Sequence, residues 1–249
     1  MSNVIIAENR SNGVGGLKVS DTDLDIIHTT IYANPILDGT SPNDQIELSN
    51  NANVLFLNSA VGGQQNVGNS TAHTFYFNDW DTTCDLTIVN SLVSGGVNSM
   101  DNNYNSPVTG TPIGQALYLV DPGQGDYMLS PVSQGLGAGV STYSGITMPY
   151  LDIEGMARPN PTGSNPDVGA VESPLDSAVF GAAYEIRNNI ACDPTYGRLK
   201  VIPLNGSGSY KYELDDLTGS ATFSNQLNVS SWTYSSLYSG DYLVTITDW

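Results

Sequence analysis

The triplet Asp79, Trp80 and Asp81 is the strongest candidate for catalytic chemistry in this sequence. Two carboxylates two positions apart point to the same side of an extended chain, and the tryptophan between them offers an aromatic face to a sugar ring. Most glycoside hydrolases use such a pair of carboxylates. Asp79 and Asp81 are therefore candidate catalytic residues and Trp80 is a candidate glycan-binding residue. The alternative is a surface loop with a partly buried tryptophan.

The acidic run DTDLD raises a second possibility, a weak calcium site formed by Asp21, Asp23 and Asp25. An EF-hand loop needs glycine at its sixth position and glutamate at its twelfth, where this chain has Ile26 and Tyr32. Alternation instead predicts a strand whose aspartates face solvent. Calcium is thus the one cofactor that the sequence leaves open.

Basic side chains are scarce and unevenly placed. The chain has 7 lysines and arginines against 25 acidic residues, a formal net charge of −18, and no base from Val19 to Ala157. A lyase that takes a proton or neutralises a uronate with lysine or arginine is hard to build there. A field of this sign repels nucleic acid, anionic membranes and, unless calcium intervenes, acidic polysaccharides. Neither His28 nor His73 belongs to a recognisable motif, and we expect His28 in a surface or ladder position.

No apolar run is long enough to span a bilayer, and the Met-Ser-Asn start lacks the regions of a secretory signal. A strand is already predicted at residues 4–6, and an uncovered first strand would expose unpaired amides. We therefore expect this chain to be a fragment of a longer one, or another chain to cover that end by self-assembly.

The elements that must position these residues are predicted to be strands. The chain contains 26 glycines and only 13% charged residues, and it has no segment with a 3.6-residue apolar period, which indicates an all-β fold. The heptapeptides NVIIAEN and HTTIYAN align so that Ile6 lies over Ile31 and Asn9 over Asn34. Such repetition is typical of stacked parallel strands with aligned inward side chains.

Two later segments, ANVLFLN and DLTIVNS, extend the alignment. They place Leu55 over Ile31, Asn58 over Asn34, and Asn90 over Asn58. Asparagine at strand ends can satisfy backbone groups of the turns, so a ladder of polar side chains is predicted there in preference to a ligand site.

Residues 117–172 combine short apolar segments with glycine- and proline-rich turns, as expected where a stack of strands ends. Arg158 is isolated there among carboxylates. We predict a structural ion pair between Arg158 and Asp152, Asp167 or Glu172.

This segment resembles the C-terminal motif of secreted bacterial right-handed parallel β-helix proteins of the pectin-lyase-like, choice-of-anchor type. The motif runs D-x-x-G-x-x-R-P followed by PD-x-G-A-x-E, and it carries no activity. The matching residues are Asp152, Gly155, Arg158, Pro159, Pro166, Asp167, Gly169, Ala170 and Glu172. The resemblance implies that residues 1–175 form the C-terminal coils of a parallel β-helix and that the protein is extracellular or at the cell surface.

A second domain is predicted for residues 176–249, where short strands follow at regular spacing, as in a small β-sandwich. Its sequence is similar to the immunoglobulin-like SprB-type repeat of Bacteroidota gliding adhesins, although Ser209 replaces the expected proline. The matching residues are Gly206, Gly208, Tyr210, Tyr212, Leu237, Gly240, Tyr242, Val244, Ile246 and Asp248. The resemblance implies type IX secretion.

Modification and cysteine pairing are also implied. Secreted Bacteroidota proteins are often O-glycosylated in Asp-Ser/Thr-small triplets, which makes Thr82 and Ser177 candidate sites. Cys84 and Cys192 fall in different predicted domains, so a bond between them is not expected. The resembled repeat implies that a partner of Cys192 lies beyond Trp249.

Three functions are compatible with these patterns. The first is a non-enzymatic adhesin or structural segment that binds surface glycans or other extracellular protein chains. The second is a fragment of a polysaccharide lyase or glycoside hydrolase, and the third is a subunit of an extracellular filament or sheath. The scarcity of bases and the tandem domains favour the first.

Overall fold

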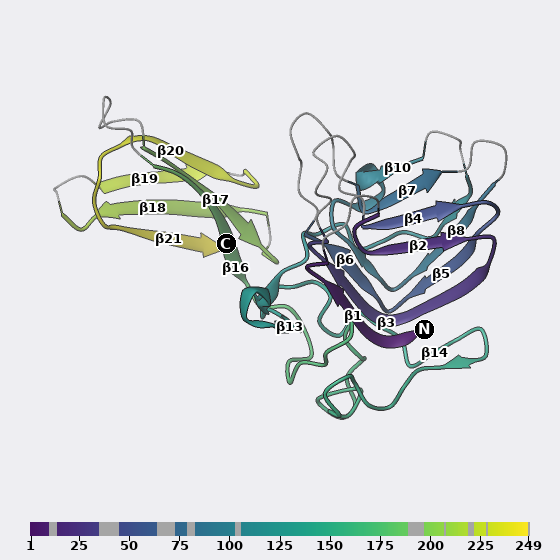
Figure 1. The fold of residues 1–249 in the computed structure, drawn as a ribbon. Coiled ribbons are helices and arrows are strands. Elements are labelled where there is room, and N and C mark those ends of the chain that lie inside the picture. Colours follow the sequence, from purple (N-terminus) through teal and green to yellow (C-terminus); the bar gives the residue numbers. More distant parts are fainter. Residues whose placement is uncertain are drawn as a thin grey trace. The chain divides into compact units, whose positions relative to one another are not determined.

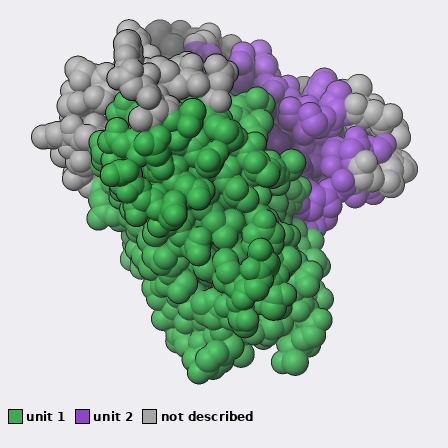
Figure 2. Space-filling view, turned by 90° about the vertical axis from the view of Figure 1, so that its right-hand side faces the viewer, with its two compact units in different colours: residues 1–178 green, residues 179–249 purple. Residues whose placement is uncertain are grey.

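The computed structural model describes residues 1–9, 14–34, 45–63, 73–78, 83–102, 106–188, 197–206, 208–218, 222–227 and 229–248. The chain divides into two compact units, residues 1–178 and 179–249, which Figure 2 distinguishes by colour. The sequence placed the division between residues 175 and 176. Regular structure is almost entirely β-strand, so the predicted all-β class is confirmed. In the described ranges no helix is long and apolar enough to cross a membrane.

Unit 1 is built on two parallel sheets, whose strands lie one above the next in Figure 1. The larger sheet contains β1 (Ser2–Ala7), β3 (Asp23–Tyr32), β5 (Asn53–Leu57), β6 (Ala60–Gly62), β8 (Asp85–Val89), β9 (Leu92–Val93) and β11 (Val108–Thr109). The smaller contains β2 (Leu17–Ser20), β4 (Ile46–Ser49), β7 (Phe75–Asn78) and β10 (Met100–Asp101). The chain passes repeatedly from a strand of the smaller sheet to strands of the larger one. The two sheets therefore share one apolar core, around which the larger sheet curls.

The core consists of aligned columns of apolar side chains. Ile26 pairs with Phe56, and Phe56 pairs with Ile88; all three are at most 2% exposed. Alternation along each strand directs these residues inward and their neighbours outward. The fully buried Phe56 also packs edge-on against Phe75 of the smaller sheet, with ring centroids 5.4 Å apart.

The predicted register is right at the first pair and wrong at the next. Ile6 pairs with Ile31, as the repeat alignment predicts. Leu55, however, pairs with Asp25 on the outer side of the sheet, and Val61 takes the place above Ile31. The reason is that β3 bends within its length and serves both β5 and β6, whereas the alignment assumed one strand per repeat.

The bend is a corner at which successive repeats hold a residue in the left-handed backbone region. The φ angles are 51° for Asn3, 42° for His28, 47° for Asn58 and 43° for Asn90. The flanking pairs place these four residues in one column, which we call the corner ladder. Asparagine is among the residues that adopt positive φ most readily, which explains its recurrence here.

The alignment of Asn90 with Asn58 is therefore confirmed, whereas that of Asn58 with Asn34 is wrong. Asn34 belongs to a separate pair: its Oδ1 accepts the backbone N–H of Asn9 at 3.1 Å, and its Nδ2 donates to the carbonyl of Ile6 at 3.0 Å. An apolar segment that ends in asparagine occurs at both Asn34 and Asn58, so the sequence alignment could not distinguish the two positions.

Buried hydroxyls bond the residues that follow the corner ladder. The N–H of Thr29 donates to Ser59 Oγ at 3.0 Å, and the N–H of Ser59 donates to Ser91 Oγ at 3.0 Å. These side chains replace the backbone ladder where the strands turn, so the corner leaves these donors satisfied.

Beyond β11 the structure differs from the prediction that residues 117–172 close the stack with further parallel strands. This segment contains two antiparallel pairs, β12 (Leu119–Asp121) with β13 (Asp126–Leu129), and β14 (Thr142–Tyr143) with β15 (Ile146–Thr147). Short 3₁₀ helices occur at Gly96–Ser99 and Pro122–Gln124. A second apolar cluster joins the segment to β6 and β9 through Ala60, Leu92, Leu117, Leu129, Leu136 and Val168. The segment is therefore a cover packed on these strands.

Unit 2 consists of two three-stranded antiparallel sheets with a common core. One sheet has the order β16 (Gly181–Arg187), β17 (Gly197–Leu204), β20 (Trp232–Leu237). The other has the order β19 (Thr222–Leu227), β18 (Tyr210–Asp216), β21 (Tyr242–Asp248). The core between the two sheets includes Val201, Tyr210, Tyr212, Leu214, Leu237, Tyr242, Val244 and Ile246.

Candidate functional site

The predicted catalytic and glycan-binding residues Asp79, Trp80 and Asp81 lie outside the described residues, as does the candidate modification site Thr82. Ser177 is exposed, and its Oγ lies 3.4 Å from Asp176 Oδ1. All five of these candidate site residues stay predictions.

The three aspartates of the possible calcium site are exposed; Asp23 and Asp25 lie on the face of β3 opposite the buried Ile26, and Asp21 lies in the bend before this strand. Across the described ranges, no three His, Cys, Asp or Glu side chains lie close enough to hold a metal ion together. A calcium site at Asp21, Asp23 and Asp25 stays a prediction.

The predicted ion pair of Arg158 is confirmed. Its Nη1 lies 2.8 Å from Glu172 Oε2, and the two side chains are 2% and 0% exposed. The guanidinium also donates from Nη2 to the carbonyl of Gly169 at 3.0 Å and from Nη1 to that of Asp167 at 3.3 Å. Arginine presents several donors in a fixed plane, which suits it to bind a carboxylate and backbone carbonyls together.

Three carboxylates complete what we call the closing network: Asp152, Asp167 and Glu172, with Arg158. Asp167 accepts N–H groups of Gly137 and Ser173, both at 2.7 Å. The backbone donors to the other two carboxylates are the N–H groups of Glu154, Met156 and Glu172 for Asp152, and those of Asn160 and Asp167 for Glu172. Since these oxygens hold loop backbone in place, the network is structural.

Burial dominates the electrostatics of the closing network. Burial raises the pKa of Asp167 to about 7, although the N–H groups of Gly137 and Ser173 act to lower it. Burial also raises the pKa of Glu172. It lowers the pKa of Arg158, although the surrounding carboxylates act in the opposite direction. Such pairs are costly to desolvate, so each partner depends on the other.

His28 is fully buried in the corner ladder, so of the two expected positions, surface or ladder, the structure shows the ladder. Asn58 Oδ1 accepts the N–H of Val140 at 3.0 Å, which turns Asn58 Nδ2 toward His28 Nε2 at 3.0 Å. Because the amide group can only donate, Nε2 must accept, and the imidazole is neutral. Burial first, and then the charge of Arg158, lower the pKa of His28 to about 3.

Exchange of His28 for asparagine is expected to remove part of the acid sensitivity of unit 1. In the unfolded chain the imidazole takes up a proton near its ordinary pKa of 6.5, and in the folded chain only near 3. The stability contributed by this depressed pKa is present above pH 6.5 and is lost as the pH falls to about 3. Asparagine suits the position because the other three ladder residues are asparagines.

Urea unfolding of both chains between about pH 4 and about pH 8 measures this effect. The stability advantage of the native chain over His28→Asn should shrink as the pH falls below 6.5. The difference in unfolding free energy between the two chains isolates the effect of His28, because the contribution of Asp167 is the same in both. The raised pKa of Asp167 stabilises the fold below pH 3.8, and this stability is lost as the pH rises through about 7, which is the opposite pH dependence. Parallel profiles would contradict the assignment.

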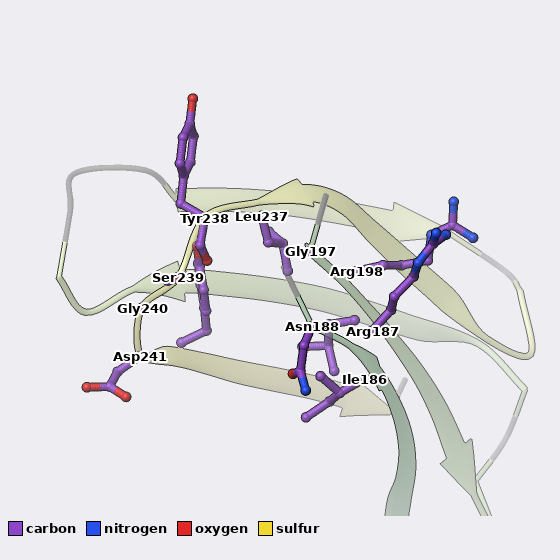
Figure 3. Close-up of a pocket in the computed structure, with 12 residues that line it drawn as sticks. Ile186, Arg187, Asn188, Gly197, Arg198, Leu237, Tyr238, Ser239, Gly240 and Asp241 are labelled. Carbon is purple, nitrogen blue, oxygen red and sulfur yellow. The ribbon is translucent and has the colours of Figure 1, made fainter. Parts of the chain in front are cut away.

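A hollow in unit 2 was not predicted from the sequence. It has a volume of about 530 Å³ and lies at the end of β16 and the start of β21 (Figure 3). We call it the arginine pocket, because Arg187 and Arg198 are directly opposite each other across β16 and β17. Figure 3 shows their side chains side by side, with Tyr238 and Asp241 directed elsewhere.

Arg187 and Arg198 place two like charges directly opposite each other on the sheet, and like charges at such positions repel. The apolar lining of the pocket includes Ile186, Leu199 and Leu237. Among the lining residues described, Asp241 is the only carboxylate and there is no histidine, so the pocket lacks the carboxylate pair of a glycosidase. Sequence held one signal: four of the 7 bases follow residue 178.

Comparisons of this chain with protein-family models, with curated proteins and with solved structures find no match.

Proposed function

We propose that this chain is a non-enzymatic segment of an extracellular or cell-surface adhesin, with a right-handed parallel β-helix as a rigid support and an immunoglobulin-like sandwich as the binding part. The observation that carries the proposal is the arginine pocket, which offers cationic, aromatic and apolar side chains without a carboxylate pair. This set can hold a partner but lacks the pair of carboxylates that most glycosidases use.

The architecture of unit 1 agrees with the role of a rigid scaffold. Its parallel strands repeat in register, its corners align in the corner ladder, and its buried ion pair at Arg158 and Glu172 is engaged in internal bonds. Stacked repeats of this kind form stiff bodies, because each repeat packs on its neighbours. The resemblance of residues 152–172 to the closing motif of secreted β-helices agrees with this assignment.

The binding role is tested with beads that carry the full chain and are washed over surfaces coated with extracellular glycans or proteins. Retention is expected to fall at least about tenfold when Arg187 and Arg198 are both changed to glutamine, because charge-assisted hydrogen bonds are lost. Lys211→Gln is the matched control, since Lys211 lies on the other sheet, paired with Glu213. Equal retention of all three chains would contradict the binding role.

The absence of catalysis is tested on the same chain with neutral and uronate-containing polysaccharides. We expect no release of reducing ends or unsaturated products above the buffer background. Release that disappears in Asp79→Ala or Asp81→Ala would overturn the proposal in favour of a polysaccharide-active enzyme. Ordered filaments of the native chain in electron micrographs would instead favour a structural subunit.

A further inference from the structure

The outer face of one sheet of unit 2 gathers basic side chains. Leu199 and Val201 of β17 pack in the core, so the alternating residues Arg198 and Lys200 lie on the outer face. Arg187 of β16 pairs directly with Arg198 and therefore lies on the same face. Figure 3 shows the side chains of the two arginines side by side. Three of the 7 bases of the chain thus lie together on two neighbouring strands.

Charge is divided between the two sheets of this unit. Strands β16, β17 and β20 together contain three bases and one acid, Glu185. Strands β18, β19 and β21 contain one base and four acids: Lys211, Glu213, Asp215, Asp216 and Asp248. The sheet with the three bases therefore attracts an anion, whereas the other sheet repels it.

A hollow of about 270 Å³ lies at this cluster of bases. Thr233 of β20 pairs with Lys200, so all three strands of the sheet contribute to the hollow. Its lining offers cationic donors, a carboxylate acceptor and a hydroxyl group, which are the groups that bind a sugar carrying an acid. The lining residues are Glu185, Ile186, Arg187, Arg198, Lys200 and Thr233.

The three bases differ in their present contacts. Lys200 forms an ion pair with Glu185 at 2.9 Å, in which the two side chains are 37% and 64% exposed. Arg187 also takes part in an interaction. Arg198 is exposed and, among the residues that the structure describes, has no ion-pair partner. Its planar guanidinium is therefore the group that an acidic ligand would bind, and the adjacent charge of Arg187 adds to the attraction.

The charge of the whole chain limits the kind of anion. A net charge of −18 repels a polyanion and a second copy of the chain alike. A single acidic group is attracted mainly by the nearest bases, because more distant charges are screened over about 8 Å at physiological ionic strength. An acidic peptide shares the acid but lacks the row of hydroxyl groups that Glu185 and Thr233 can bind.

We propose that the outer face of the sheet formed by β16, β17 and β20 binds a single acidic sugar of an extracellular glycan. Its carboxylate or sulfate group lies on Arg198 beside Arg187, and its hydroxyl groups bond to Glu185 and Thr233. This inference rests on the proposed function, because it names the class of ligand that the binding part takes.

The test is a titration of the full chain with short glycans, followed by the NMR chemical shifts of backbone amides and arginine side chains. 3′-Sialyllactose carries one carboxylate, 3′-sulfated lactose carries one sulfate, and lactose carries no acid. At least one of the two acidic sugars is expected to bind at least about tenfold more tightly than lactose, with the largest shifts in β16, β17 and β20. Comparison of the two identifies the acid that is preferred.

Three variants of the chain locate the contact. Arg198→Gln should weaken binding of the acidic sugar at least about tenfold, because charge-assisted hydrogen bonds are lost. Thr233→Val keeps the shape of the side chain but removes its hydroxyl group, and should weaken binding about two- to tenfold. Lys211→Gln is the matched control, because Lys211 lies on the other sheet beside Glu213. Arg198 and Thr233 are exposed, so their variants should fold.

Three results would overturn the inference: equal affinity for lactose and both acidic sugars, unchanged binding by Arg198→Gln, or equal affinity for the acidic peptide acetyl-Ser-Glu-Ser-amide. If beads are retained through Arg187 and Arg198 while no acidic sugar binds, the inference fails and the proposed function stands. If retention does not depend on these arginines, the proposed function itself fails.

Discussion

Glu172→Gln is expected to lower the free energy of unfolding of unit 1 by about 3–5 kcal/mol, the usual cost of removing one partner of a buried ion pair. Glutamine has the same shape, but its amide group is a donor. The oxygens of Glu172 accept from Asn160, Asp167 and Arg158, so the amide would face a donor in either orientation. The charge of Arg158 would also lose its nearest counter-ion.

Urea unfolding of the full chain measures this change, with each unit's transition followed separately. Lys18→Gln is the control, because Lys18 forms an ion pair with Glu47 at the same 2.8 Å separation but is 53% exposed. We expect it to cost less than about 1 kcal/mol. A similar, small cost for both variants would show that the closing network does not stabilise unit 1.

Phe56→Ala is expected to destabilise unit 1 by about 3–5 kcal/mol, since it leaves a cavity in a close-packed column. Phe56 is fully buried between Ile26 and Ile88, and it also contacts the ring of Phe75 from the smaller sheet. Removing it therefore damages packing between repeats and between sheets.

The neighbouring substitution Leu55→Ala is the control for this column. Leu55 pairs with Asp25 and Thr87 on the outer side of the sheet and is only partly buried, so we expect a loss of about 1 kcal/mol or less. Equal losses at positions 55 and 56 in urea unfolding would contradict the alternation of inward and outward residues.

The strand content and the first repeat pair were predictable because alternation and repetition leave a direct mark on sequence. The position of Ile6 over Ile31 follows from such a mark. The bend of β3 at His28 does not, because a histidine with positive φ interrupts no apolar pattern. An alignment that allowed a corner inside the strand would have found Asn3, His28, Asn58 and Asn90 in one column.

The candidate sites divide in the same way. Arg158 was predictable as an ion-pair residue, because an isolated base among carboxylates has few other roles. The arginine pocket was not, since Arg187 and Arg198 meet only through the pairing of β16 with β17. The exposure of Tyr184 and Ile186 on β16 was hidden for the same reason: alternation identifies them as inward residues, but the width of the opposite sheet decides whether they are covered.

Two hydrogen bonds between the parallel strands of unit 1 and the segment of residues 117–172 have a kinetic consequence. The N–H of Ala170 donates to Thr30 Oγ1 across 140 residues, and Asn58 bonds to Val140 across 82. Contacts of such long sequence separation form late, because the entropy of closing large loops must first be overcome. Unit 1 should therefore reach its native state slowly, and its nascent strands would stay exposed to aggregation until residue 172 has left the ribosome.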